Sequence, residues 1–221
     1  MPNVGTPDSL RRPDSRQARR SLIIACGAIA RELKVLLRGP ELRHLTLMCL
    51  PADLHNRPDQ IPEAIREALN REKNHYERLF VAYADCGTGG KLDRVLAEFG
   101  VERLPGAHCY EFFAGSRLFA SLHEEEPGTF YLTDFLVRHF DRLVVEGLGL
   151  DRHPQLLTTY FGNYERVIYL AQQPTPALER TARACAERLG LRFEMRNPGL
   201  VQIARALEPL ADESQSPVVA P

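Results

Sequence analysis

The chain has 221 residues, of which 44% are hydrophobic and 26% are charged, as in an ordinary globular protein. Its formal net charge is −1, which excludes a general electrostatic attraction to nucleic acid or to an anionic membrane. No apolar run reaches the 18 residues that would predict a transmembrane helix. We therefore expect a cytoplasmic protein with no nucleic-acid partner and no membrane partner.

The expected folded region is one domain over residues 20–210. Residues 1–19 are rich in arginine and proline and lack the apolar segment of a secretory signal, so we expect a disordered lead-in there. Residues 211–221 predict a disordered tail.

Apolar runs of strand length alternate with helical patterns along the first half of the chain. Strands are predicted at 22–26, 45–50, 79–86 and, more loosely, within 101–115. Apolar residues at helical spacing predict helices over 28–39, 61–76 and 87–100.

The second half continues the alternation. A helix is predicted over 131–150, then a strand at 166–172, a helix over 175–190, a strand at 191–197 and a last helix over 199–210. Strands that alternate with helices indicate an α/β fold with a mainly parallel, Rossmann-like open sheet and helices on both faces.

The five cysteines are the most informative polar residues. Their odd number and the absence of a CxxC pair argue against a disulfide framework. Four of them lie near predicted strand ends, where open α/β sheets bind ligands: Cys26, Cys49, Cys86 and Cys109. Cys185 lies on the apolar stripe of a helix, so we expect it in the core.

A cluster of thiols at one sheet edge suits a soft or borderline metal ion, because zinc prefers cysteine and histidine ligands. The predicted ligands are Cys26, Cys86, Cys109 and His108, with zinc, or alternatively iron, as the cofactor. His55 and His108 are the catalytic candidates, and whether Cys49 joins the site is open. A metal-free thiol enzyme, such as a racemase, isomerase or lyase acting on a small acid, is the alternative.

The glycine-rich segment CGTGG at 86–90 joins a predicted strand to a predicted helix. Its backbone N–H groups suggest a cradle for an anionic group of a substrate, formed by Gly87, Thr88, Gly89 and Gly90. The segment matches neither the Walker motif nor GxGxxG. The structural alternative is a tight turn in which Thr88 caps the following helix.

Several longer stretches resemble one family: LIIACGAIARE, LPADLHNRPDQI, VAYADCGTGGKLD, GAHCYEFFAG, EEPGTFYLTDFLVRHFD and GLDRHPQLLTTYFGNYERVIYLAQ. They are similar to the uncharacterised bacterial and archaeal family of domains of unknown function numbered 1638, over roughly residues 20–195. Members are often encoded beside corrinoid-dependent methylamine and betaine methyltransferases. The resemblance implies a role in one-carbon or methylated-amine metabolism, with a small anionic or methylated-amine substrate and a corrinoid protein or methyltransferase as partner. A non-enzymatic accessory or chaperone of such a system is a further alternative.

Overall fold

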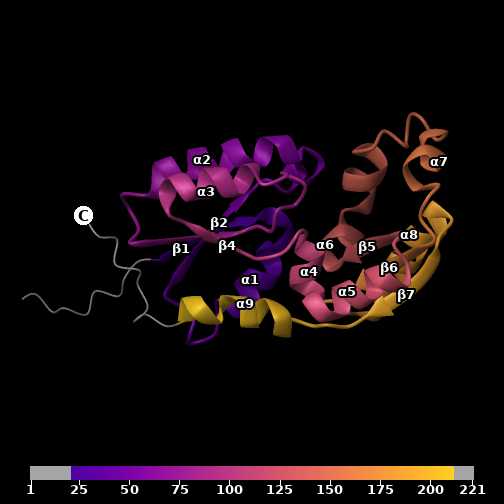
Figure 1. The fold of residues 1–221 in the computed structure, drawn as a ribbon. Helices are drawn as coiled ribbons and strands as arrows, with labels where there is room; N and C mark the ends of the chain where they lie inside the picture. The colour runs from indigo at the N-terminus through magenta and orange to yellow at the C-terminus, as the bar shows by residue number, and fades with distance from the viewer. Residues whose placement is uncertain (1–20, 212–221) are drawn as a thin grey trace, which may run out of the picture.

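A computed structural model describes residues 21–211, and it confirms the predicted α/β fold with parallel strands (Figure 1). The strands form two sheets, a four-stranded one in the order β2-β1-β3-β4 and a three-stranded one in the order β5-β6-β7. Every strand pair is parallel. The lead-in predicted for 1–19 and residues 212–221 of the predicted tail lie outside the described residues.

The first sheet and its connections occupy the N-terminal half of the chain. Its strands are β1 (Ser21–Cys26), β2 (Leu45–Leu50), β3 (Arg78–Ala82) and β4 (Glu102–Arg103). Three helical connections cross between these strands: η1 with α1 (Gly27–Ile29 and Ala30–Leu36), η2 and η3 with α2 (Ala52–Asn56, Pro58–Gln60 and Ile61–Glu72), and α3 (Lys91–Phe99).

The second sheet follows two short helices, α4 (Cys109–Ala114) and α5 (Ser116–Glu125). Its strands are β5 (Thr129–Thr133), β6 (Arg166–Leu170) and β7 (Arg192–Arg196). The remaining helical segments are α6 (Asp134–Arg138), the π-helix η4 (Asp141–Glu146), α7 (Leu156–Phe161), α8 (Pro176–Leu189) and α9 (Val201–Ala211).

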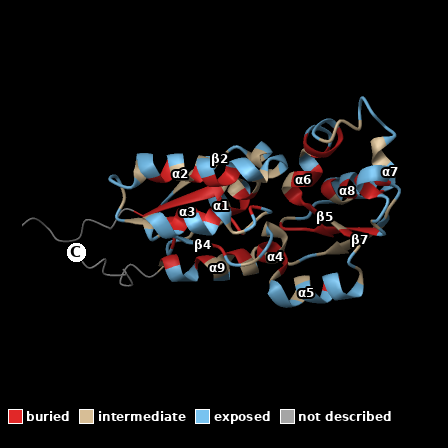
Figure 2. Cartoon of the chain, turned by 45° about the horizontal axis from the view of Figure 1, so that its top comes forward, coloured by how far each residue is buried: buried red, intermediate tan, exposed pale blue. Residues whose placement is uncertain are grey.

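Alternating side chains place each sheet between two helical layers. On β1, Leu22 and Ile24 pack with α2 and α3, while Ile23 and Ala25 face the opposite side. That opposite side is covered by α1, α4 and the C-terminal helix α9 (Figure 1). Buried residues accordingly run through β1, β3, β5 and β6 (Figure 2).

One core joins the two sheets. Tyr131 of β5 and Ile168 of β6 belong to the same buried cluster as Ile23 of β1. The other face of the second sheet packs against α6, η4 and α8. After β7 the chain returns to the first half, where α9 lies beside α1 and α4 (Figure 1).

The main departure from the sequence-based prediction is the segment 131–150, which is not one helix. Residues 129–133 form strand β5, and a short α-helix and a π-helix follow. The Thr133 hydroxyl accepts a hydrogen bond from the Leu136 N–H and so caps α6, which fixes the helix start after the strand. The strand predicted within 101–115 is also shorter, because most of that segment forms the loop before α4 and α4 itself.

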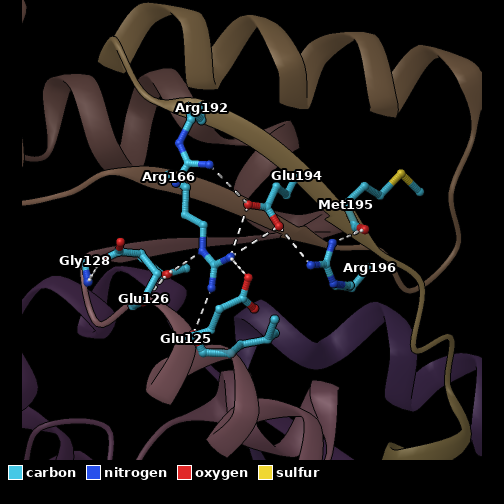
Figure 3. Close-up of polar contacts among 10 residues, drawn as sticks. Glu125, Glu126, Gly128, Arg166, Arg192, Glu194, Met195 and Arg196 are labelled. Atoms are coloured by element: carbon cyan, nitrogen blue, oxygen red, sulfur yellow. Dashed lines mark hydrogen bonds and ion pairs between the residues drawn. The ribbon is translucent and has the colours of Figure 1, made fainter.

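The second sheet contains a buried cation, Arg166 at the start of β6 (Figure 3). Its guanidinium donates to the Thr129 hydroxyl at 2.9 Å, to the Leu122 carbonyl at 2.9 Å and to Glu194 at 3.2 Å. It also pairs with Glu125 at 3.2 Å. These contacts compensate the buried charge and tie β6 to β5, β7 and α5.

Within residues 21–211, no helix is both long enough and apolar enough to cross a membrane.

Candidate functional site

A narrow cavity lies where β1 and β3 end. Its polar lining consists of Cys26, His55, Tyr83, Cys86 and Cys109. Apolar residues from η1, α2, β3 and the strand ends complete the wall: Ile29, Ile61, Ala82, Ala84 and Leu104. The empty space amounts to about 380 Å³, including its opening. Three of the four strand-end cysteines are thus gathered at the carboxyl edge of the first sheet, where the sequence placed them.

The backbone around Cys86 brings two of these thiols together. The Cys86 N–H donates to the Ala107 carbonyl at 2.8 Å, and the Asp85 N–H donates to the Gly106 carbonyl at 3.1 Å. These two bonds hold the segment after β3 against the segment before α4, whose first residue is Cys109. The Cys86 and Cys109 side chains line the same cavity, and each is the largest influence on the other's pKa.

Cys86 also has an unusual backbone conformation. Its φ is +49°, and it is the one non-glycine residue with a positive φ in the described part of the chain. A residue with a Cβ in the left-handed region carries a steric cost of about 1–2 kcal/mol. Such strain tends to occur at functional sites, where the surrounding structure holds it in place.

The two paired thiols have opposite electrostatic environments. The neighbouring Cys109 thiol outweighs burial and, with the backbone N–H groups of Cys109 and Ala84, lowers the pKa of Cys86 to about 7. The interaction with Cys86 and burial raise the pKa of Cys109. At pH 7 Cys86 is therefore a thiolate in about half of the molecules, while Cys109 stays protonated.

Cys26 is the last residue of β1 and stays protonated. Burial raises its pKa to about 11, although its sulfur accepts a hydrogen bond from the Ala28 N–H at 3.4 Å. The Tyr83 hydroxyl lies near this sulfur but has no hydrogen bond of acceptable geometry, and burial raises its pKa well above the usual value. The cavity thus offers a neutral thiol and an unpaired phenol beside the Cys86 thiolate.

His55 links this cavity to a second one between the two halves. The second cavity, of about 300 Å³, is lined by His55, Cys109, Tyr110, Thr133 and apolar side chains of both halves. Burial lowers the pKa of His55, and the nearby His108 lowers it further. The imidazole is therefore neutral at pH 7 and packs edge-on against the Tyr110 ring, with centroids 6.4 Å apart.

The glycine loop has a different arrangement from the predicted anion cradle. Asp85 accepts hydrogen bonds from the Thr88 hydroxyl at 2.7 Å, the Gly90 N–H at 2.9 Å and the Gly89 N–H at 3.1 Å. These bonds lower the pKa of Asp85 to about 2. Two of the backbone N–H groups assigned to an external anion, those of Gly89 and Gly90, are occupied by this carboxylate, and the Thr88 N–H donates to the Asp85 carbonyl at 3.0 Å. An external anion would have to displace these bonds. Thr88 is not the cap of α3 either, because Gly90 occupies that position.

The other predicted site residues lie away from the cavity. His108 is exposed at the start of α4 and does not line it. Cys49 is exposed on β2, and Cys185 is buried in α8, as expected. Among residues 21–211, no three His, Cys, Asp or Glu side chains are arranged to hold a metal ion. The zinc or iron site with Cys26, Cys86, Cys109 and His108 therefore stays a prediction.

The sequence analysis missed two residues of the site region, Tyr83 and Asp85, and a buried carboxylate outside the cavity lining, Glu32. Tyr83 and Asp85 flank Ala84 in the segment after β3, and their proximity to Cys86 in the chain was the available signal. Glu32 of α1 is buried, and its Oε2 has no hydrogen-bond partner. Burial raises the pKa of Glu32, and Asp134 of the second half adds to the effect. Nothing in the local sequence distinguishes Glu32 from an exposed helix glutamate.

Comparison with known proteins agrees with the resemblance seen in the sequence. No curated protein matches the chain. The profile of one family, described as protein of unknown function (DUF1638), matches residues 49–207 and so covers more than half of the chain. The chain therefore belongs to the DUF1638 family.

Proposed function

We propose that the cavity at the ends of β1 and β3 is a metal-free thiol site that acts on a small molecule. The observation that carries this proposal is the contact between Cys86 and Cys109, which leaves Cys86 as the thiolate on the cavity wall. A thiolate is the reactive form of cysteine, both as a nucleophile and as a base. The cavity has room for little more than a water molecule, so a substrate of a few heavy atoms enters only when the lining side chains move.

The thiols on the cavity wall have distinct roles in this proposal. Cys86 removes a proton from a carbon atom of the substrate, and Cys26, which is protonated, returns a proton to it. No hydrogen bond joins Cys26 to Cys86, whereas Cys109 interacts with Cys86 directly and stabilises its thiolate. This assignment corresponds to an isomerase, racemase or lyase acting on a small acid.

A metal site is the second candidate, because three thiols and one imidazole line the same cavity. Zinc and iron both bind thiolates, and Cys26, Cys86 and Cys109 would be the ligands, after a rearrangement of the side chains. A role in one-carbon or methylated-amine metabolism, a corrinoid partner and an accessory function rest on the family resemblance alone.

The pH dependence of alkylation tests the thiol site. Protein purified in the absence of air and without a metal-chelating tag is treated with iodoacetamide, and the rate at each cysteine is followed by peptide mass spectrometry. We expect a half-maximal rate near pH 7 at Cys86. Cys49, which is exposed as a residue, is the internal control. The pH at which its alkylation rate is half-maximal, its half-point, should lie above that of a free thiol, because partial desolvation of the thiol raises its pKa. A half-point at Cys86 no lower than that at Cys49 would overturn the proposal.

Elemental analysis of the same sample separates the two candidates. The thiol site predicts no stoichiometric zinc or iron in the wild type. About one metal ion per chain, lost in Cys86→Ser and retained in Cys49→Ser, would replace the metal-free site with the metal site.

A further inference from the structure

We propose that Cys86 and Cys109 are a redox-active pair that closes reversibly to a disulfide when a hydroperoxide oxidises it. The inference rests on the proposed thiol site and adds a form of regulation to it. Closing the disulfide consumes the Cys86 thiolate, so the site would work only under reducing conditions.

The pair is distinguished from the other cysteines by its mutual interaction. Cys86 and Cys109 line the same cavity from two segments that backbone hydrogen bonds join, and each is the largest influence on the other's pKa. Cys26 has only a weaker, longer-range interaction with them. Cys49 is exposed on β2 and does not line the cavity, and Cys185 is buried in the other half of the molecule. Among the five cysteines, which all lie in the described region, these two have the strongest mutual interaction.

The backbone holds the two cysteines in register. The hydrogen bonds from Asp85 to Gly106 and from Cys86 to Ala107 fix the spacing between the two segments within three residues of both thiols. The segment after Cys86 contains Gly87, Gly89 and Gly90, all with positive φ, so it can absorb a small adjustment. Both residues are partly exposed, and both line the cavity.

The reaction balances with hydrogen peroxide as the oxidant. The Cys86 thiolate attacks one peroxide oxygen, so that an S–O bond forms, the O–O bond breaks and hydroxide leaves as water after taking a proton. The Cys109 sulfur then attacks the resulting sulfenic acid, so that the S–S bond forms, the S–O bond breaks and a second water leaves. Two thiols are oxidised, one peroxide is reduced to two waters, and a dithiol reductant restores both thiols.

The sequence makes the linkage easy to map. Cleavage after lysine and arginine places Cys86 in peptide 79–91 and Cys109 in peptide 104–117, while Cys26 and Cys49 fall in other peptides. The full-length protein is treated with a small excess of hydrogen peroxide, blocked with iodoacetamide and digested. We expect peptides 79–91 and 104–117 to be joined, and dithiothreitol to separate them.

Three variants control the experiment. Cys49→Ser should form the same link, because Cys49 lies outside the cavity. In Cys109→Ser, which keeps a hydroxyl donor beside Cys86, the link should be lost and Cys86 should proceed to sulfinic acid. Cys86→Ser should leave Cys109 reduced, which keeps the test valid if one of the two variants fails to fold.

The contrary result is wild-type protein whose Cys86 is overoxidised, or linked only to another chain, with no bond to Cys109. That result, combined with an alkylation half-point of Cys86 near pH 7, would contradict the redox pair and still support the proposed thiol site. The opposite combination is a Cys86–Cys109 link together with an alkylation half-point of Cys86 no lower than that of Cys49. It would contradict the proposed thiol site and support the redox pair.

Discussion

The second sheet pairs its buried charges with hydrogen bonds, whereas the first half leaves two buried polar groups unpaired. In the second half, Arg166 has four partners, and Asp134 accepts from the Tyr169 hydroxyl at 2.7 Å and from two backbone N–H groups. In the first half, the Tyr83 hydroxyl and the Glu32 Oε2 are buried without partners. Tyr131 of β5 is also unpaired, but it lies in the core that both sheets share.

This difference fits a structural role for the second half and the chemical role proposed for the first. Buried polar groups that are fully hydrogen-bonded fix one packing arrangement, while unpaired ones cost stability. The unpaired Tyr83 hydroxyl and the strained Cys86 both lie at the cavity. Substitutions in the second half should therefore change the free energy of unfolding most, and substitutions at the cavity should change reactivity most.

The largest effect is expected for Arg166→Met. Loss of the guanidinium leaves Glu194, Thr129 and the Leu122 carbonyl without their donor, and breaking a buried ion pair typically costs about 3–5 kcal/mol. Arg192→Met is the matched control, because Arg192 is exposed and meets Glu194 only at 4.0 Å, so the change should be within about 0.5 kcal/mol. Urea unfolding measures both, and equal losses would contradict the assignment of Arg166.

A pair of tyrosines sharpens the comparison directly. Tyr169→Phe removes a bond to the buried Asp134 carboxylate and should cost about 1.5–3 kcal/mol. Tyr83→Phe removes a hydroxyl that has no partner, so it should be neutral or should stabilise the protein by up to about 1 kcal/mol. A larger loss for Tyr83→Phe than for Tyr169→Phe, measured by urea unfolding, would reverse the contrast between the halves.

The next effect concerns pH at Cys86. Cys109→Ala removes the main cause of the lowered pKa, so the half-point for alkylation of Cys86 should rise from near pH 7 by about one pH unit or more. Cys109→Ser retains a donor and should shift the half-point less. Because the folded-state pKa of Cys86 lies below its unfolded value, its ionisation stabilises the fold above about pH 9, and this contribution is lost as the pH falls through 7. An unchanged half-point in Cys109→Ala would show that the pair is not coupled.

The smallest effect tests the backbone strain. Cys86→Gly and Cys86→Ala both remove the thiol, but only glycine adopts a φ of +49° without steric cost. The glycine variant should be more stable than the alanine variant by about 1 kcal/mol in thermal or urea unfolding. Equal stabilities would indicate that the conformation carries no strain.

The strand ends show how much of the site was predictable. The positions of Cys26 and Cys86 followed from apolar runs of strand length and from the rule that parallel strands share one carboxyl edge. Cys49 failed to join them although it lies near a strand end, because it is on an edge strand with its side chain exposed. The sequence predicts which strand ends lie at the same edge of a sheet. It does not predict the direction of one side chain, which depends on the strand register.

The segment 129–146 shows where the pattern was insufficient. Its apolar residues fit helical spacing, yet Thr129–Thr133 forms a strand paired with β6. The decisive interactions are long-range: β5 pairs with residues 166–170, and Asp134 at its end binds residues 169, 172 and 173. The contacts of Asp85 with the glycine loop could not be predicted for another reason. The same loop sequence is compatible with binding either the carboxylate of Asp85 or the anionic group of a substrate.

The return of α9 to the first half has a consequence for biosynthesis. α9 places Ile203 and Leu207 in the core under β1, and the His44 side chain lies 3.2 Å from the Leu210 carbonyl, 166 residues along the chain. While the ribosome is still making β5 to β7, the underside of the first sheet lacks its last covering helix. The nascent chain therefore exposes this apolar face until residue 211 has left the exit tunnel, and this is the interval in which a chaperone would bind it.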